Sequence, residues 1–301
     1  MVRALSFLLL LVGLAGCADD PPGPLAAGCT LERKADLQLT IVRNFMLAPV
    51  SIDGRRVLLV VDTGAEASTL TPEAAAALHL PRDASHGSVL IGISGPIRTP
   101  NVRVAKFDID TIQRTDQSLG LGRMPAFPGL HPPVSGLLGT DVLSGYEVDL
   151  DVPNGRMSLY AAHGCAGGYR PWPGALAVPL IQTRSGLLFV EALVDGRTVT
   201  ALLDTGARTS LISRRTAATL GVTDATLAGD PERKGIGIGM GGIEFRQHRF
   251  TDIGLPGAMV YGMAADVADL RLPGVEMLLG ADFLGPRRIW LSYATSTLYL
   301  R

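Results

Sequence analysis

The sequence has almost no net charge and few residues of the kinds that bind metals. Its 27 basic and 28 acidic residues leave a formal net charge of −1, so it lacks the positive excess that a nucleic-acid-binding surface requires. The five histidines are scattered and form no H-E-x-x-H or Cys/His pattern: His79, His86, His131, His163 and His248. We therefore expect no metal, no other cofactor and no nucleic-acid partner.

Cysteine and aromatic residues are also scarce, whereas glycine and proline are abundant. The 36 glycines and 20 prolines exceed the usual combined share of about 12%. This composition favours turn-rich β structure over a helical bundle, and the 47% of hydrophobic residues are enough to build a core. At about 150 residues per domain, the 301 residues correspond to one large or two modest domains.

The sequence begins with a short apolar run. Residues 1–16 carry one early arginine and an apolar stretch that fits a signal peptide and is too short for a spanning helix. The stretch ends in Leu14-Ala15-Gly16-Cys17, which resembles the bacterial lipobox and implies lipidation of Cys17. Residues 17–34 would then be the lipidated cysteine and a Pro/Gly-rich tether. The expected location is the bacterial cell envelope, lipid-anchored and facing the periplasm, with the outer membrane slightly favoured by Ala18. An ordinary secretory signal that happens to carry a cysteine is the alternative.

The two other cysteines are candidates for a disulfide. If Cys17 is acylated, Cys29 and Cys165 remain in an oxidising compartment, where disulfides persist. Cys29 precedes the first folded segment and Cys165 follows its end, so the bond would join the termini of that domain. Two free thiols are the alternative.

The chain contains an internal duplication. The segment from Val50 aligns without gaps on the segment from Ala192, and twelve of the 26 aligned positions between Asp53 and Leu78 are identical. Chance would give about two identities. We therefore interpret the chain as two tandem copies of one domain.

Each copy predicts the same local structure. Asp53-Gly54 and Asp195-Gly196 are two-residue hairpin turns, and the returning strands at 57–61 and 199–203 are apolar enough to be buried on both faces. Each returning strand leads directly into Asp-Thr-Gly-Ala.

Two short helices are expected in each copy. Thr71 and Ser213 occupy the same repeat position and can cap the first helix. An apolar L-L-G strand followed by Asp141 or Asp282 predicts a second helix capped by that aspartate. Catalytic roles for these two aspartates are the alternative, and we favour capping because the other aspartate pair lies in a D-T-G loop.

A glycine-rich hairpin is expected between these signals in each copy, at residues 91–96 and 235–242. The second contains Gly237-x-Gly239-x-x-Gly242, which is also the spacing of a dinucleotide-binding fingerprint. A charged segment precedes it in place of an apolar strand, and no apolar helix follows. A mobile β-hairpin is therefore the better interpretation.

The two loops at the ends of the buried strands carry a family resemblance. Val61-Asp62-Thr63-Gly64-Ala65 and Leu203-Asp204-Thr205-Gly206-Ala207, each followed by a glycine-rich hairpin and L-L-G-x-D-x-L, resemble the aspartic peptidases. Each copy is similar to a retropepsin-like subunit, and the duplicated chain resembles the bilobal, pepsin-like arrangement. The resemblance implies a mainly β fold of two acid-protease lobes related by a pseudo-twofold axis, built as closed or partly open β-barrels with short helices. We expect an N-terminal lobe at 35–163, a linker at 164–176 and a C-terminal lobe at 177–301.

The resemblance also implies a catalytic pair. Asp62 and Asp204 would share one proton, because two carboxylates at contact distance cannot both ionise easily. One would activate a water while the other protonates the peptide carbonyl, in a cleft between the lobes. The expected activity is that of an aspartic endopeptidase acting on peptide or protein substrates.

Neighbouring residues would support this pair. Gly64 and Gly206 would allow a tight turn that directs N–H groups at the carboxylates. Thr63 and Thr205 would hydrogen-bond across the pseudo-twofold axis.

The residue after each D-T-G differs from that in many bilobal enzymes, and this difference affects the pH at which we expect activity. Ala65 and Ala207 stand where those enzymes carry a hydroxyl that stabilises the ionised aspartate, so we expect activity nearer to neutral pH.

The two glycine-rich hairpins would be flaps that close over the substrate and exclude water. Neither contains the tyrosine typical of pepsin-like flaps, and their apolar side chains suggest substrates with hydrophobic side chains at the scissile bond. The expected flap and substrate-binding residues are Ile91, Gly92, Ile93, Gly237, Ile238, Gly239 and Met240.

A second reading belongs to another class of function. A lipoprotein could keep this fold as an inactive peptide-binding or scaffold module. In either case we expect a monomer with internal pseudo-twofold symmetry.

Overall fold

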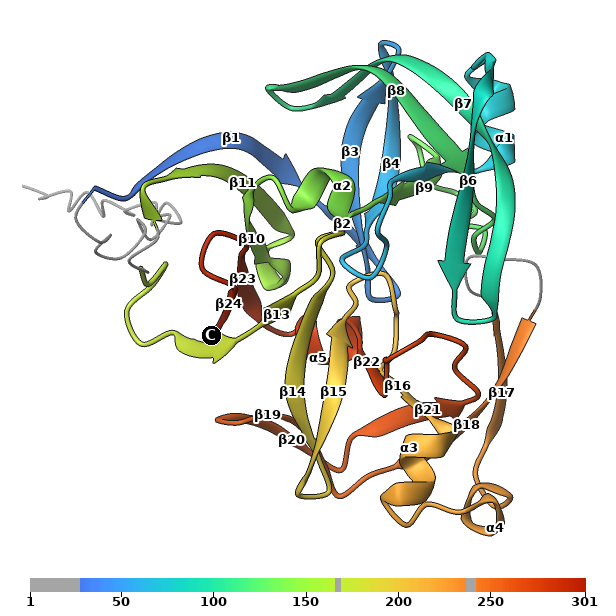
Figure 1. The fold of residues 1–301 in the computed structure, drawn as a ribbon, viewed down its shortest axis with the longest axis vertical. Helices are drawn as coiled ribbons and strands as arrows, with labels where there is room; N and C mark the ends of the chain where they lie inside the picture. Colours follow the sequence, from blue (N-terminus) through green and yellow to red (C-terminus); the bar gives the residue numbers. More distant parts are fainter. Residues whose placement is uncertain (1–27, 166–168, 237–241) are drawn as a thin grey trace, which may run out of the picture.

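A computed structural model describes residues 28–165, 169–236 and 242–301 (Figure 1). The expected signal peptide, the lipidation site Cys17 and most of the tether lie outside these residues. The chain forms two β-rich lobes, the N-terminal lobe at the top of Figure 1 and the C-terminal lobe at the bottom, joined by a third sheet. The predicted mainly β, bilobal fold is confirmed.

The N-terminal lobe is an eight-stranded sheet in the order β2-β3-β4-β9-β5-β8-β7-β6. An additional pairing of β3 with β7 closes six of its strands into a barrel. The strands are β2 (Thr40–Val42), β3 (Phe45–Ile52), β4 (Arg55–Val61), β5 (Thr69–Leu70), β6 (Arg82–Gly92), β7 (Gly95–Ile109), β8 (Ile112–Leu121) and β9 (Val134–Leu138).

The C-terminal lobe repeats this topology in a more open sheet. Its path is β17-β18-β21-β16-β22-β15-β14-β19-β20, with β13 paired to β14. The strands are β13 (Ile181–Gln182), β14 (Leu188–Val194), β15 (Arg197–Leu203), β16 (Leu211–Ser213), β17 (Glu232–Ile236), β18 (Gly242–Arg249), β19 (Asp252–Leu255), β20 (Ala258–Tyr261), β21 (Ala264–Ala268) and β22 (Met277–Leu279).

Each lobe contains one of the predicted two-residue turns, between β3 and β4 in the N-terminal lobe and between β14 and β15 in the C-terminal lobe. Asp53 and Gly54 have φ angles of 47° and 79°, and Asp195 and Gly196 have 47° and 73°. Two successive positive φ angles are what a type I′ hairpin turn requires, and Asp and Gly tolerate them. The returning strands β4 and β15 are buried over their last five residues except at Thr200, as their apolar sequences predict.

The helices are short, and the first helix of each copy is capped as expected. Thr71 Oγ1 accepts a hydrogen bond from the backbone N–H of Ala74 at 3.1 Å, and Ser213 Oγ accepts one from Thr216 at 3.0 Å. The helices are α1 (Pro72–Ala77), α2 (Thr140–Leu143), α3 (Arg214–Thr219), α4 (Asp224–Leu227) and α5 (Ala281–Leu284), with a 3-10 turn η1 at Val152–Asn154.

A six-stranded sheet joins the lobes, in the order β1-β11-β10-β23-β24-β12. Three of its strands come from each half of the chain, and β10 pairs with β23 at its centre. The strands are β1 (Thr30–Gln38), β10 (Glu147–Asp151), β11 (Arg156–His163), β12 (Leu176–Pro179), β23 (Arg288–Ser292) and β24 (Thr297–Leu300). Strand β1 starts at Thr30, ahead of the lobe boundary expected at residue 35.

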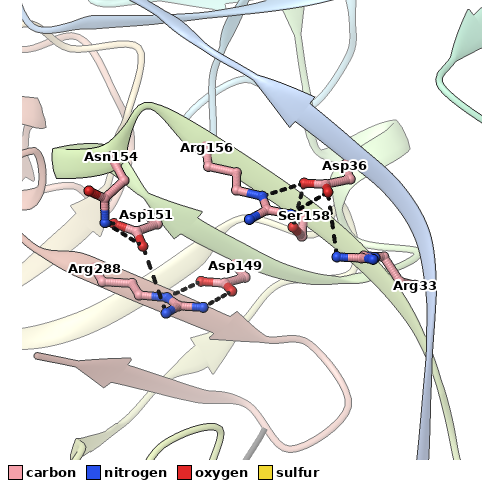
Figure 2. A network of polar contacts seen from close by, with 8 residues as sticks. All are labelled: Arg33, Asp36, Asp149, Asp151, Asn154, Arg156, Ser158 and Arg288. Carbon is pink, nitrogen blue, oxygen red and sulfur yellow. Dashed lines mark hydrogen bonds and ion pairs between the residues drawn. The ribbon is translucent and has the colours of Figure 1, made fainter. Parts of the chain in front are cut away.

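The two faces of this sheet differ because side chains alternate along a strand. Val148 and Leu150 lie on the face that belongs to the main hydrophobic core. The opposite face carries an ion pair between the two halves of the chain, in which Arg288 donates to Asp149 at 3.0 and 2.6 Å (Figure 2). In the same sheet, the carboxylate of Asp36 in β1 accepts hydrogen bonds from the guanidinium of Arg156 in β11. Charge pairing therefore accompanies the packing where the lobes meet.

The segment between the lobes is packed against this sheet. Tyr169 and Trp172 are buried in one cluster with Trp290 and Tyr299. The predicted disulfide is present between Cys29 and Cys165, in the same cluster. The linker expected at 164–176 thus contributes Tyr169 and Trp172 to a buried aromatic cluster. None of the helices among the described residues is long and apolar enough to cross a bilayer.

Candidate active site

The two D-T-G-A loops face each other where the lobes meet. Asp62 follows the last residue of β4, and Asp204 follows the last residue of β15. Each aspartate's backbone N–H donates to the parallel strand beside it, Asp62 to Leu138 O at 3.0 Å and Asp204 to Leu279 O at 3.1 Å. The L-L-G segments therefore fix the position from which each loop leaves its sheet.

Thr63 and Thr205 lock the loops together across the pseudo-twofold axis. The backbone N–H of Thr63 donates to Thr205 Oγ1 at 3.0 Å, and that of Thr205 donates to Thr63 Oγ1 at 3.1 Å. Each hydroxyl in turn donates at 2.7 Å to a carbonyl of the opposite strand, that of Leu203 or Val61. Both threonines are fully buried, so three polar groups of each lobe, the threonine N–H, its hydroxyl and the strand carbonyl, depend on the other lobe for their hydrogen bonds.

The carboxyl groups of Asp62 and Asp204 lie next to each other, each against the glycine of the opposite loop. A Cβ placed on Gly64 would lie 2.5 Å from Cγ of Asp204, and one on Gly206 would likewise overlap the carboxylate of Asp62. Glycine is therefore required at both positions for steric reasons. The backbone N–H of Gly64 donates to Asp62 Oδ1, and that of Ala207 donates to Asp204 Oδ1, both at 2.9 Å.

Burial is the main influence on the charge of this pair. It raises the pKa of both carboxyls above the usual range of an aspartate. The charge of Asp204 and a hydrogen bond between the two groups raise the pKa of Asp62 further, whereas the backbone N–H groups oppose the shift. The pair therefore holds on to one proton at a pH where isolated carboxyls have lost theirs.

Asp141 and Asp282 have a structural role that differs from the one expected. Neither caps a helix, because the N-cap residues of α2 and α5 are Gly139 and Gly280, and no side chain makes a cap hydrogen bond. Asp141 instead accepts from the N–H and hydroxyl of Ser68, at 2.8 and 2.7 Å. Capping was thus the wrong prediction, because in both helices the aspartate lies within the first turn.

The same arrangement is repeated in the second copy and ties two segments of each loop together. Asp282 accepts from the N–H and hydroxyl of Ser210. Ser68 Oγ and Ser210 Oγ each accept the N–H of the L-L-G glycine at 3.0 Å. Sequence reasoning missed these serines, although their identity in the two copies was a signal.

The first glycine-rich hairpin reaches the other lobe. Strands β6 and β7 meet at the pair Gly92 and Gly95, and in Figure 1 their hairpin extends toward the C-terminal lobe. Ile93 O accepts the backbone N–H of Arg271 at 3.1 Å, and its side chain packs against an apolar cluster of the C-terminal lobe. Ile91 is 55% exposed. Ala207 packs against the same cluster, so the hairpin tip shares an apolar surface with the second D-T-G-A loop.

The second hairpin is present as the antiparallel pair β17 and β18, in agreement with a hairpin and not a nucleotide loop. Its expected substrate-binding residues, Gly237, Ile238, Gly239 and Met240, lie outside the described residues.

Apolar side chains flank the aspartates on both sides. In the N-terminal lobe, Ala65 packs against a cluster built on Leu47, Leu58, Val60 and Leu137. In the C-terminal lobe, Ala207 packs against one built on Leu202, Leu211, Phe245, Ala268 and Leu278. The strands before the aspartates supply Leu58 and Val60 from β4 and Leu202 from β15, and neighbouring strands supply the others. In the part of the chain that the structure describes, no group of three or more His, Cys, Asp or Glu side chains could hold a metal ion.

Comparisons with known proteins agree with this geometry. Residues 48–142 match a family model described as aspartyl protease, and residues 190–286 match one described as gag-polyprotein putative aspartyl protease. No curated protein matches the chain. A retropepsin-like aspartic protease from Rickettsia conorii is 18% identical, with a TM-score of 0.35 over 42% of this chain and 89% of that one.

The aspartic proteinase from Irpex lacteus shares the fold of both lobes. It is 14% identical, with a TM-score of 0.51 over 88% of this chain and 96% of that one. The two family matches lie one in each lobe, and each includes one D-T-G-A loop. The chain therefore belongs to the aspartic peptidase superfamily, with two protease lobes in a single chain.

Proposed function

We propose that this protein is an aspartic endopeptidase in which Asp62 and Asp204 activate a water molecule for attack on a peptide bond. The observation that carries the proposal is the pairing of two carboxyls of raised pKa, Asp62 buried and Asp204 half-buried, on loops joined by reciprocal threonine hydrogen bonds. Perturbed carboxyl pairs of this kind are typical of catalytic sites.

The chemistry requires one proton on the pair. The ionised carboxylate removes a proton from the water as its oxygen attacks the carbonyl carbon, and the protonated carboxyl donates its proton to the carbonyl oxygen. The product is a tetrahedral diol. The group that has gained the water's proton then gives it to the amide nitrogen, the diol returns a proton to the other carboxyl, and the C–N bond breaks. The pair ends with its original single proton.

The apolar surroundings support hydrophobic side chains on both sides of the scissile bond. The clusters under Ala65 and Ala207 lie beside the two aspartates, one in each lobe. The tip of the β6–β7 hairpin adds Ile93 to the second cluster. Burial of apolar surface is worth about 25 cal/mol per Å², so such contacts would favour extended apolar segments over charged ones.

The proposal includes a location and an oligomeric state. The lipobox-like Leu14-Ala15-Gly16-Cys17 supports a lipid anchor in the bacterial cell envelope, facing the periplasm. The disulfide between Cys29 and Cys165 is consistent with an oxidising compartment. Because one chain supplies both aspartates, a monomer would be sufficient for activity.

The activity is tested with a mixed peptide library, with cleavage products mapped by mass spectrometry across pH. A statine-type peptide, which mimics the diol, is added in parallel. Cleavage at apolar pairs that the statine peptide inhibits is the expected result. Tight binding of the statine peptide without cleavage at any pH would instead indicate a peptide-binding module. The anchor is tested by acyl labelling of the full chain, with Cys17→Ser as the control.

A further inference from the structure

The two halves of the chain hold their D-T-G-A loops with different side chains at one equivalent position. Thr140 follows the L-L-G segment of the first copy, and Ala281 follows that of the second. The backbone N–H of Thr140 donates to Ala65 O at 2.9 Å. In the second copy, the backbone N–H of Ala281 donates to Ala207 O at 2.8 Å. The backbone contacts are therefore equivalent, and the hydroxyl of Thr140 is the difference between the two positions.

The hydroxyl of Thr140 reaches the opposite lobe. Three carbonyl oxygens surround it, and that of Ser185 is the nearest at 2.7 Å, compared with 3.2 Å for Ala65 and 3.4 Å for Glu66. A hydroxyl has one proton to donate, so the bond goes to Ser185. The hydroxyl of Ser185 donates in the other direction, to Glu66 Oε1 at 2.7 Å. Two hydrogen bonds of opposite direction therefore join the N-terminal lobe to the turn between β13 and β14.

This turn fits closely against α2 (Figure 1). Gly186 has a φ angle of 86°, and a Cβ on it would lie 2.8 Å from Cβ of Ser144 and 3.0 Å from Cβ of Thr140. Both Gly186 and Thr140 are buried. Within the turn, Thr183 Oγ1 accepts the backbone N–H of Leu187 at 3.0 Å. The turn is therefore held in shape by its own bonds and packed against the helix that carries Thr140.

The equivalent contact on the other side of the pseudo-twofold axis is weaker. The turn between β2 and β3 consists of Arg43 and Asn44, and Asn44 Nδ2 donates to Arg208 O at 3.4 Å. Ala281 has no hydroxyl that could bond to this turn. Among the described residues, this long hydrogen bond is the one side-chain hydrogen bond between the β2–β3 turn and the C-terminal lobe.

The contact between Thr140 and the β13–β14 turn links the segments that carry the two aspartates. Ala65 lies three residues after Asp62 in the same loop, and β14 pairs with β15, which ends one residue before Asp204. The reciprocal bonds of Thr63 and Thr205 cross the pseudo-twofold axis itself. Contacts on an axis limit the separation of two bodies but restrain rotation about that axis poorly. A contact away from the axis restrains the rotation as well.

We propose that Thr140 and Ser185 are positioning residues, which hold the two carboxyls in the relative orientation that catalysis requires. This inference rests on the proposed endopeptidase function. Neither residue acts on the peptide itself. Attack on the carbonyl carbon and protonation of its oxygen need both carboxyls in place at once, so a loosened contact lowers kcat and leaves peptide binding nearly unchanged.

The first test is Thr140→Val, which keeps the shape of the side chain and removes the hydroxyl. A misplacement of about 1 Å costs about a hundredfold in rate, so kcat on one cleaved peptide should fall about ten- to a hundredfold, with KM within about threefold of the wild type. Thr140→Ser keeps the hydroxyl, so its kcat should stay within about threefold of the wild type. Asn44→Ala is the matched control: it removes the long bond on the opposite side and should change kcat by less than about twofold.

The pH profile distinguishes positioning from a general loss of stability. Two neighbouring carboxyls lose their protons in two steps, and the separation between the two pKa values grows as the groups come closer. The two limbs of the pH–kcat profile should therefore lie closer together in Thr140→Val than in the wild type or Asn44→Ala. Urea unfolding shows which variants are folded under the assay conditions.

A second variant covers the case in which Thr140→Val does not fold. Ser185→Ala removes the bond to Glu66 at a partly exposed site and leaves the bond from Thr140 to the Ser185 carbonyl in place. It should lower kcat by about two- to tenfold, which corresponds to the loss of one hydrogen bond.

The outcomes separate the inference from the function. A fall in kcat in Thr140→Val that Thr140→Ser does not show and Asn44→Ala does not reproduce, with a narrower pH profile, supports the inference. An unchanged kcat in folded Thr140→Val or in Ser185→Ala, an equal fall in Asn44→Ala, an unaltered pH profile, or a rise in KM at constant kcat overturns it and leaves the endopeptidase function standing. If the folded wild type cleaves no peptide at any pH, the proposed function itself fails.

Discussion

Replacement of Thr63 or Thr205 by valine should be strongly destabilising, because these side chains hold the two lobes at the active site. Valine keeps the shape of threonine but removes the hydroxyl. In Thr63→Val, the N–H of Thr205 loses its acceptor and the carbonyl of Leu203 loses its donor. Both groups stay buried, and an unsatisfied buried group costs about 1–3 kcal/mol. The expected loss in the free energy of unfolding is therefore about 2–6 kcal/mol.

The matched controls separate the hydrogen bonds from packing. Thr63→Ser keeps the hydroxyl and removes one methyl group, so it should cost about 1 kcal/mol. Thr205→Val should resemble Thr63→Val, because the two hydroxyls make equivalent bonds at 2.7–3.1 Å. The double variant should lose less than the sum of the single losses, since either substitution already loosens the shared contact.

Urea unfolding of the wild type and these variants provides the measurement. A loss below about 0.5 kcal/mol for Thr63→Val would refute the reasoning, since that is the usual effect of a surface substitution. Equal losses for Thr63→Val and Thr63→Ser would show that packing, and not the hydroxyl, couples the lobes.

Three further outcomes follow from the structure. With Ala65 and Ala207 beside buried carboxyls of raised pKa, kcat/KM should peak at weakly acidic to neutral pH, and a pH–rate profile with an optimum below about pH 3 would contradict this. Asp62→Asn should raise the melting temperature near neutral pH. The pKa of Asp62 is higher in the folded than in the unfolded wild type, so the wild type loses stability as the pH rises past about 4, whereas the asparagine variant does not. If thermal scans show that the variant's gain in melting temperature does not shrink toward pH 4, the pKa of Asp62 is not raised. Replacing Cys29 and Cys165 by serine should lower the free energy of unfolding by about 2–5 kcal/mol in urea titrations, because their disulfide spans 136 residues, and unchanged stability would show that it constrains little.

The sequence predicted the parts of the fold that depend on neighbouring residues. The Asp53-Gly54 turn, the buried strand after it and the cap at Thr71 all follow from local backbone preferences, and the duplication repeats them in the second copy. The placement of Asp62 and Asp204 at the ends of those strands follows for the same reason.

The parts that were missed depend on contacts between distant residues. The central pairing of β10 with β23 joins Val148 to Leu291, and nothing in either short strand specifies that partner. Trp172 stands in a proline- and glycine-rich segment typical of a linker, and it is buried because it packs against Trp290 and Tyr299 of the joining sheet. Asp141 was expected to cap its own helix, but its partner Ser68 lies 73 residues away.

The central claim is that Asp62 and Asp204 act as one catalytic pair. It is tested most directly by comparing the wild type with Asp62→Asn and Asp204→Asn on one cleaved peptide, with folding and binding of the statine peptide checked for each protein. We predict that either substitution lowers kcat by more than about a thousandfold while the protein stays folded, because the pair needs one group as base and the other as acid. Cleavage that survives in either folded variant would contradict the account.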